Sequence, residues 1–171
     1  AYSLLGLGEI DLADGELDEA RRKLREAQGI WESIRYRSGL TEVAVSLGRL
    51  AFTEGDRAQA LREFREARGL SREMAKPGTE LVATAYVRLL APDDDPEAAA
   101  RLADLDPVSE HHRRTEGWFV LHRATRDPAA LDRALACVEQ ASASLPPAWR
   151  AGYRLEVPLH REILRAAGRL E

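Results

Sequence analysis

Apolar and small residues in the first part of the chain follow a pattern that returns after forty residues. Between Leu7 and Ala27, apolar positions alternate with charged ones at helical spacing, and the same order reappears downstream. The matched pairs are Leu7 with Leu47, Gly8 with Gly48, Gly15 with Gly55, Ala20 with Ala60, Leu24 with Phe64, and Ala27 with Ala67. A fixed period of this size is typical of proteins built from stacked structural repeats.

Each copy of the pattern predicts two helices joined by a short turn. The expected pairs span residues 2–14 with 17–34, and residues 40–53 with 57–75. Gly15 and Gly55 fall in the turns, where glycine adopts at little cost the positive φ that ends a helix. The pattern therefore predicts two helical hairpins in tandem.

Two further glycines lie inside the predicted helices and indicate close packing. Glycine in a helix interior costs about 1 kcal/mol relative to alanine, and Gly8 and Gly48 both occupy such positions. A helix tolerates this cost where a neighbouring helix must approach closely. We therefore expect each glycine to face the second helix of its hairpin near Ala20 or Ala60.

These residues resemble the tetratricopeptide repeat (TPR), which carries Leu-Gly in its first helix, Gly at the turn, and Ala, a large apolar residue and Ala along its second helix. The resemblance implies an all-α fold, a right-handed superhelix of antiparallel helix hairpins. The expected domain comprises about four repeats, at residues 1–38, 39–76, 77–106 and 107–147, and a capping helix at 148–171. The usual TPR period is about 34 residues. Longer repeats of this kind look like those of bacterial signalling ATPases and transcription regulators.

The second half of the chain departs from the pattern. Pro77-Gly78 breaks the second repeat, and the third is degenerate, with helices expected at 79–90 and 97–104. The fourth recovers the TPR spacing through Trp118, Leu121, Ala134, Ala141 and Pro146. Pro158 lacks the backbone donor that a helix interior needs, so the helical tail must kink or split there.

The composition and charge of the chain restrict the kinds of binding partner and the cellular compartment that we expect. The net charge is −4 with both signs interleaved, which argues against direct nucleic-acid binding. Cys137 is the only cysteine, and no apolar run approaches the about 18 residues of a membrane span. We therefore expect a cytoplasmic protein without a membrane partner. Because the chain begins inside a repeat without an initiator Met, we also expect a piece of a longer protein.

No residue cluster predicts an enzyme, a metal site or a cofactor. His111 and His112 are adjacent, so on a helix they point in different directions and make a poor chelate. The acidic run 93–95 lacks the spaced ligands of a calcium loop. The sequence contains no phosphate-binding glycine motif and no local set of nucleophile, base and oxyanion donors. We therefore expect no catalysis and no cofactor.

The predicted function is protein–protein interaction through the concave face of the superhelix. In TPR-like stacks the first helix of each hairpin lines that face, and apolar groups beside both charges suit an extended or helical peptide. The candidate partner-binding residues are Tyr2, Leu5, Glu9, Leu12, Glu42, Val45, Arg49, Phe52, Glu116, Phe119, Arg123 and Arg126. The Lys/Asn clamp of chaperone-binding TPR proteins is missing from these helices.

Two alternatives to a peptide groove remain open. The first is a small-ligand-sensing regulatory domain with a pocket inside the superhelix near Trp118 and Phe119. The second is a groove that is merely solvated. The protein-interaction reading makes the chain a scaffold or sensor arm of a larger bacterial regulator.

The first repeat also predicts self-association. Tyr2, Leu4, Leu5 and Leu7 all lie in its first turns, and no polar helix precedes them. Terminal units of a solenoid normally carry a polar outer face. We therefore expect this surface to pack on a neighbour, and the isolated chain to form a symmetric homodimer through it.

Overall fold

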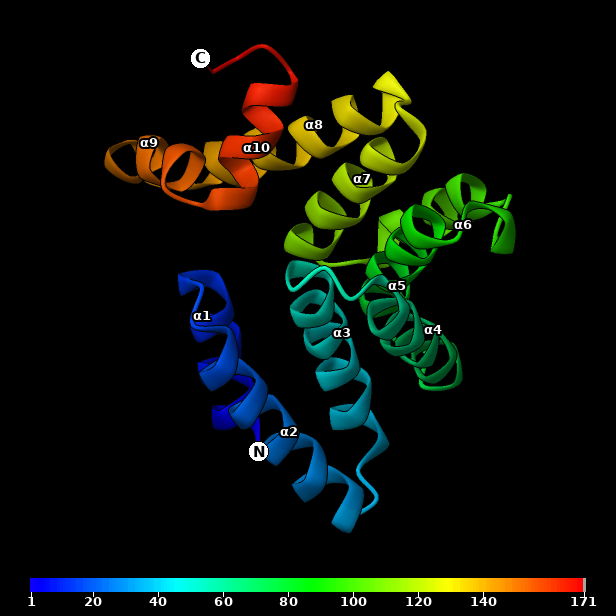
Figure 1. Cartoon of the computed structure of the whole chain (residues 1–171). Coiled ribbons are helices and arrows are strands. Elements are labelled where there is room, and N and C mark those ends of the chain that lie inside the picture. The colour runs from blue at the N-terminus through cyan, green and yellow to red at the C-terminus, as the bar shows by residue number, and fades with distance from the viewer. Residues whose placement is uncertain (171) are drawn as a thin grey trace.

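The computed structural model describes residues 1–170, which form ten α-helices and two short 3-10 helices and contain no strand (Figure 1). The helices are α1 Tyr2–Asp14, α2 Leu17–Ser33, α3 Arg37–Thr53, α4 Arg57–Glu73, α5 Pro77–Leu90, α6 Ala98–Leu105, α7 His111–Thr125, α8 Pro128–Ser144, α9 Pro147–Leu155 and α10 Pro158–Ala166. The 3-10 turns η1 and η2 span Pro92–Asp94 and Asp106–Val108, on either side of α6. The expected all-α class is confirmed for this part of the chain.

The first four helices form the two predicted hairpins. α1 packs on α2 and α3 packs on α4, and the turn glycines Gly15 and Gly55 adopt φ values of 84° and 83°. A methyl group added at Gly8 would lie 2.9 Å from Leu24 Cγ, and one added at Gly48 would lie 2.8 Å from Phe64 Cε1. These distances confirm the predicted close contacts, because only glycine leaves room for the facing side chain.

Two helices begin earlier than the sequence pattern predicts. α3 begins at Arg37 rather than at residue 40, and α5 begins at Pro77 rather than at residue 79. The preceding helices end in left-handed residues, Arg35 with φ 54° and Ala75 with φ 52°. This one-residue reversal lets the next helix start at once, and the proline that was expected to break the chain occupies the first turn of α5, where its missing N–H costs nothing.

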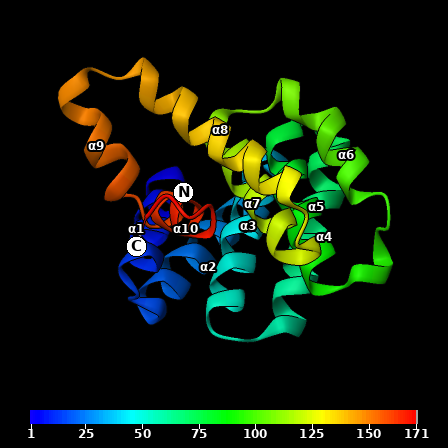
Figure 2. The same cartoon turned by 90° about the horizontal axis from the view of Figure 1, so that it is seen from above.

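The second half is less regular, and the chain turns back at its end. α6 has only eight residues, and the predicted break at Pro158 separates α9 from α10. α10 packs on α8 and α9 and buries Ile163 and Leu164. Figures 1 and 2 show the chain reversing direction between α8 and α10. The capping segment expected at 148–171 therefore contains two short helices, split at Pro158 as predicted.

Two apolar cores meet at α3. One core joins α1, α2 and α3 through Leu24, Trp31 and Val43, and the other extends from α3 to α10. α3 gives Val43 and Leu50 to the first core and Val45 and Ala51 to the second. Because both sides of α3 are buried, this helix joins the two parts of the molecule in one packed unit.

Candidate functional site

A pocket of about 390 Å³ lies where the first helices of the hairpins meet α10. We call it the inner pocket. Six of the predicted partner-binding residues contribute to it: Leu12, Arg49, Phe52, Glu116, Phe119 and Arg123. The remaining walls come from Thr53, Tyr86, Val120, Pro158, Leu159 and Glu162. Five helices, α1, α3, α5, α7 and α10, therefore converge on one site.

An ion pair between α3 and α7 forms the polar wall of the inner pocket. Arg49 Nε donates to Glu116 Oε1 at 2.8 Å, and a second guanidinium nitrogen contacts the other carboxylate oxygen. Glu9 of α1 lies 3.5 Å from Arg49 and accepts a 2.7 Å hydrogen bond from Ser46. Burial lowers the pKa of Arg49, but the charge and hydrogen bonds of Glu116 raise it by more, so the guanidinium stays charged.

Aromatic rings form the apolar wall beside this pair. Phe52 meets Tyr86 edge to face at 5.5 Å, and Tyr86 stacks on Phe64 at 4.1 Å. Burial, followed by the charge of Glu116, raises the pKa of Tyr86, so its phenol stays neutral. The guanidinium of Arg123 lies 5.6 Å from the centre of the Phe52 ring. Cation–π contacts of this kind hold a cation near an apolar surface.

Arg123 differs from Arg49 in having no acidic partner among residues 1–170. Its side chain is exposed at the edge of the inner pocket. A carboxylate brought to this point from outside would therefore meet a cation that makes no ion pair within residues 1–170, in a pocket whose lining also contains Glu162.

The other predicted site residues lie elsewhere. Leu5 and Val45 are buried in the two cores, with exposed fractions of 8% and 0%. Glu42 accepts from Lys76 and from Arg113, each at 2.7 Å. Tyr2 packs against Trp31 with ring centres 5.2 Å apart, and Arg126 ends α7 with a left-handed φ of 59°.

Trp118 and Phe119 face different parts of the molecule. Phe119 lines the inner pocket, whereas the Trp118 indole donates to Asp106 at 2.6 Å and lies beneath Arg133 at 4.4 Å. Of the two residues named for a ligand pocket, only Phe119 is at the site. Sequence reasoning also missed Tyr86 and the α10 residues Pro158, Leu159 and Glu162. Pro158 indicated a break in the tail but not the direction in which the chain continues.

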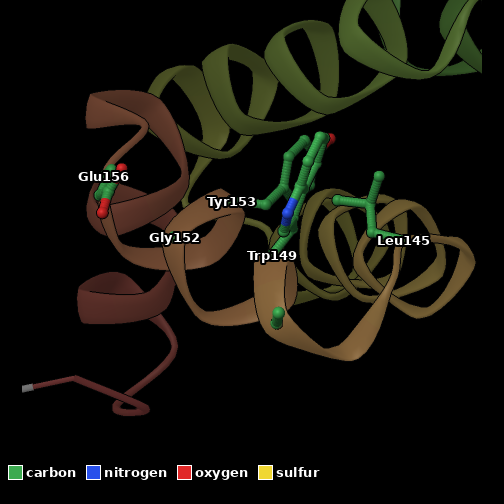
Figure 3. Close-up of a pocket in the computed structure, with 6 residues that line it drawn as sticks. Leu145, Trp149, Gly152, Tyr153 and Glu156 are labelled. Atoms are coloured by element: carbon green, nitrogen blue, oxygen red, sulfur yellow. The ribbon is translucent and has the colours of Figure 1, made fainter.

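A second pocket, of about 470 Å³, lies between the end of α8 and α9 (Figure 3). We call it the α9 pocket. Its lining residues are Leu145, Ala148, Trp149, Gly152, Tyr153 and Glu156. Figure 3 shows the rings of Trp149 and Tyr153 projecting from the same side of α9.

Within residues 1–170, no group of three or more His, Cys, Asp or Glu side chains is arranged to hold a metal ion. Cys137 is buried, and burial raises the pKa of its thiol. In the same part of the chain, no helix combines the length and the low polarity needed to cross a membrane. No protein-family model, curated protein or solved structure matches this sequence.

Proposed function

We propose that this chain is a protein-interaction module, a right-handed stack of TPR-like hairpins that binds a partner peptide on its inner side. The support from the fold is the tandem pairing of α1 with α2 and α3 with α4 and the convergence of α1, α3, α5 and α7 on one pocket. Such a module would act as a scaffold or sensor arm of a larger regulator.

The observation that carries the proposal is the combination of apolar walls with one unpaired cation. Phe52, Phe119 and Leu159 offer an apolar surface to a side chain that enters the inner pocket. Arg123 stands beside that surface without an acidic partner in the described residues. The geometry favours a segment in which a large apolar residue is followed or preceded by an acidic one.

The ion pair does not provide this selectivity. Arg49 and Glu116 neutralise each other across α3 and α7, and their hydrogen bonds are directed at each other. A partner that competed for either group would leave the other charge buried without compensation, which is strongly unfavourable. Recognition therefore rests on the rings and on Arg123.

Selection from a library of displayed random twelve-residue peptides tests the proposal. Peptides selected on the native chain should be enriched in a large apolar residue adjacent to Asp or Glu. Arg123→Glu should weaken their binding by about tenfold or more, the loss typical of an interface residue that matters. The matched control is Arg161→Glu, which makes the same charge change on an exposed residue of α10 outside the pocket.

The control variant should bind the selected peptides as the native chain does. Equal binding to both variants would show that the selected peptides do not use the inner pocket. Enrichment of peptides with no acidic residue would contradict the role given to Arg123.

The size of the inner pocket supports a second candidate, a small-ligand-sensing domain. Its volume of about 390 Å³ falls within the range of about 300–1,000 Å³ found for ligand pockets. The same chemistry would then select a small aromatic carboxylate. Phenylacetate that raises the melting temperature and displaces the selected peptides would favour this candidate, whereas phenylacetate without effect would favour the peptide.

A further inference from the structure

The α9 pocket contains polar groups that the fold leaves without partners. Trp149 is 69% exposed, while the other two tryptophans, Trp31 and Trp118, are 2% and 3% exposed. Within residues 1–170, the Trp149 indole N–H and the Tyr153 hydroxyl make no hydrogen bond, and Glu156 makes no ion pair. The pocket therefore offers two donors and one carboxylate to a molecule from outside.

Packing does not explain why residue 149 is a tryptophan. None of the nine residues of α9 is fully buried, and α9 contacts only the neighbouring segments α8 and α10 to any extent. Tyr153 rests partly on His160, with ring centres 4.5 Å apart, but Trp149 projects beyond the helix into the solvent. Large exposed aromatic side chains next to a hollow mark interaction sites more often than structural ones.

We propose that the α9 pocket binds an extended, proline-containing peptide that carries one basic residue. An extended polyproline helix has no internal hydrogen bonds, so its carbonyl groups need donors, and its rings stack on exposed aromatic side chains. Trp149 and Tyr153 provide the stacking surface and the two donors. Glu156 provides the charge that selects Arg or Lys.

The position of the Glu156 carboxyl group sets the spacing in the peptide. This group lies 3.4 Å from the position that a Cβ would take on Gly152, so it folds back to the level of a residue three positions after Trp149. At about 1.5 Å per residue, this is about 4.5 Å along the helix axis. A polyproline helix advances about 3.1 Å per residue. The basic residue should therefore lie one or two positions from the proline that stacks on Trp149.

Other ligand classes fit the α9 pocket less well. Its lining contains no cation, so an anion would meet Glu156 uncompensated. A lone quaternary ammonium ion prefers aromatic rings on several sides, whereas here Leu145, Ala148 and Gly152 form the rest of the lining. Figure 3 shows Glu156 at the opposite end of the site from Leu145, an elongated arrangement that suits a chain better than a compact ion.

The two arginines of α9 do not block a basic peptide. Arg150 donates to the carbonyls of Leu145 and Ala143 at 2.9 and 3.1 Å and so ends α8. Arg154 lines a separate pocket with Arg150 and Glu139. Both lie on a different face of α9 from Trp149 and Tyr153.

A synthetic nine-residue peptide tests the proposal directly. The probe is acetylated, amidated and proline-rich, and it carries one arginine two positions after a proline. In a second version of the peptide the arginine precedes that proline by the same number of positions, and a third version replaces the arginine with glutamate. Because the other two tryptophans are buried, a saturable blue shift of tryptophan emission should report the covering of Trp149.

Variants then separate this site from the rest of the molecule, with a fluorescein-labelled peptide and anisotropy as the readout. Trp149→Ala should weaken binding by about tenfold or more. Glu156→Arg should reverse the preference, so that the glutamate peptide binds more tightly than the arginine peptide. Arg123→Glu, in the inner pocket, should leave peptide binding unchanged, and circular dichroism should show native helicity for all three variants.

Several results would overturn the inference. These are no emission shift up to about 1 mM peptide, equal affinity for the arginine and glutamate peptides, or a preference that survives Glu156→Arg. Tetramethylammonium that displaces the peptide at equal concentration would identify a cation site instead. An emission shift that follows protein concentration without peptide would identify a second copy of the chain as the occupant. None of these results bears on the inner pocket.

Discussion

Gly48→Ala should destabilise this protein, although alanine is the better helix former. The added methyl group would lie 2.8, 2.9 and 3.0 Å from Cε1, Cζ and Cδ1 of Phe64. Ordinary contacts of this kind are 3.4–4 Å, so the ring must move. Phe64 is fully buried, and its other face stacks on Tyr86 at 4.1 Å with an interplanar angle of 4°. The ring therefore has no free space to move into.

The size of the effect follows from two opposing terms. Overpacking of a core typically costs about 1–3 kcal/mol. Replacing glycine by alanine inside a helix raises the free energy of unfolding by up to about 1 kcal/mol, because alanine is the better helix former. Because the buried Phe64 ring cannot move aside, we place the cost of overpacking at about 2–3 kcal/mol and expect a net loss of about 1–2 kcal/mol for Gly48→Ala. Gly69→Ala is the matched control, because nothing lies within 4 Å of its added methyl group, and it should gain about 0.5–1 kcal/mol.

Thermal unfolding followed by circular dichroism measures both variants. In a chain of this length, 1 kcal/mol shifts the melting temperature by about 2–4 °C, so the two variants should differ by at least about 3 °C. In the Phe64→Ala background the cost of Gly48→Ala should disappear, since the obstructing ring is gone. Equal stability of Gly48→Ala and Gly69→Ala would refute the argument that α3 and α4 touch at this position.

Three further predictions concern charge, metals and assembly. Burial raises the pKa of Glu42, but Lys76 and Arg113 lower it by more, so its pKa in the folded protein lies below the ordinary value. Because Glu42→Gln removes the charge that these two cations face, it should lower the unfolding free energy at pH 7 by about 1–3 kcal/mol. This difference should shrink below about pH 4, as Glu42 takes up its proton in the folded state, whereas Glu73→Gln, in an exposed pair with Arg37, should cost almost nothing. EDTA should leave the melting temperature unchanged, and a fall of several degrees would reveal a metal site. Three apolar side chains of α1 are largely exposed: Tyr2 by 56%, Leu7 by 48% and Ile10 by 57%. The chain should therefore dimerise through this surface, and light scattering should show a dimer that Ile10→Arg dissociates. A strict monomer at high concentration would contradict this prediction.

Local features of the fold could be predicted because interactions between residues close together in the sequence determine them. Residues 2–14 form a helix with the bounds that were expected, and the glycines at 8, 15, 48 and 55 adopt the contacts and the φ values that their positions predicted. The left-handed ends at Arg35 and Ala75 were not predicted. Neither residue is a glycine, so the sequence contains no signal that the next helix starts two residues later.

The candidate site was harder to predict because it depends on contacts between distant parts of the chain. Arg49 and Glu116 are 67 positions apart, and their contact depends on α5, which packs on both α3 and α7. The wall that α10 adds depends on the burial of Ile163 and Leu164 in a core that starts at α3. A helical period predicts which face of one helix is inward, but not which distant helix will cover it.

The arrangement of charges decides which variants can report on binding. Arg49 was a candidate partner-binding residue, yet removing it would leave Glu116, whose side chain is 10% exposed, without its cation. Losing one member of a buried pair typically costs about 3–5 kcal/mol, so Arg49→Ala would lose binding even if Arg49 never touched a partner. Arg123 makes no ion pair within residues 1–170, and its guanidinium lies 5.6 Å from the centre of the Phe52 ring, so its replacement leaves no buried charge behind. A loss of binding in Arg123→Glu with unchanged stability would therefore assign recognition to the inner pocket itself.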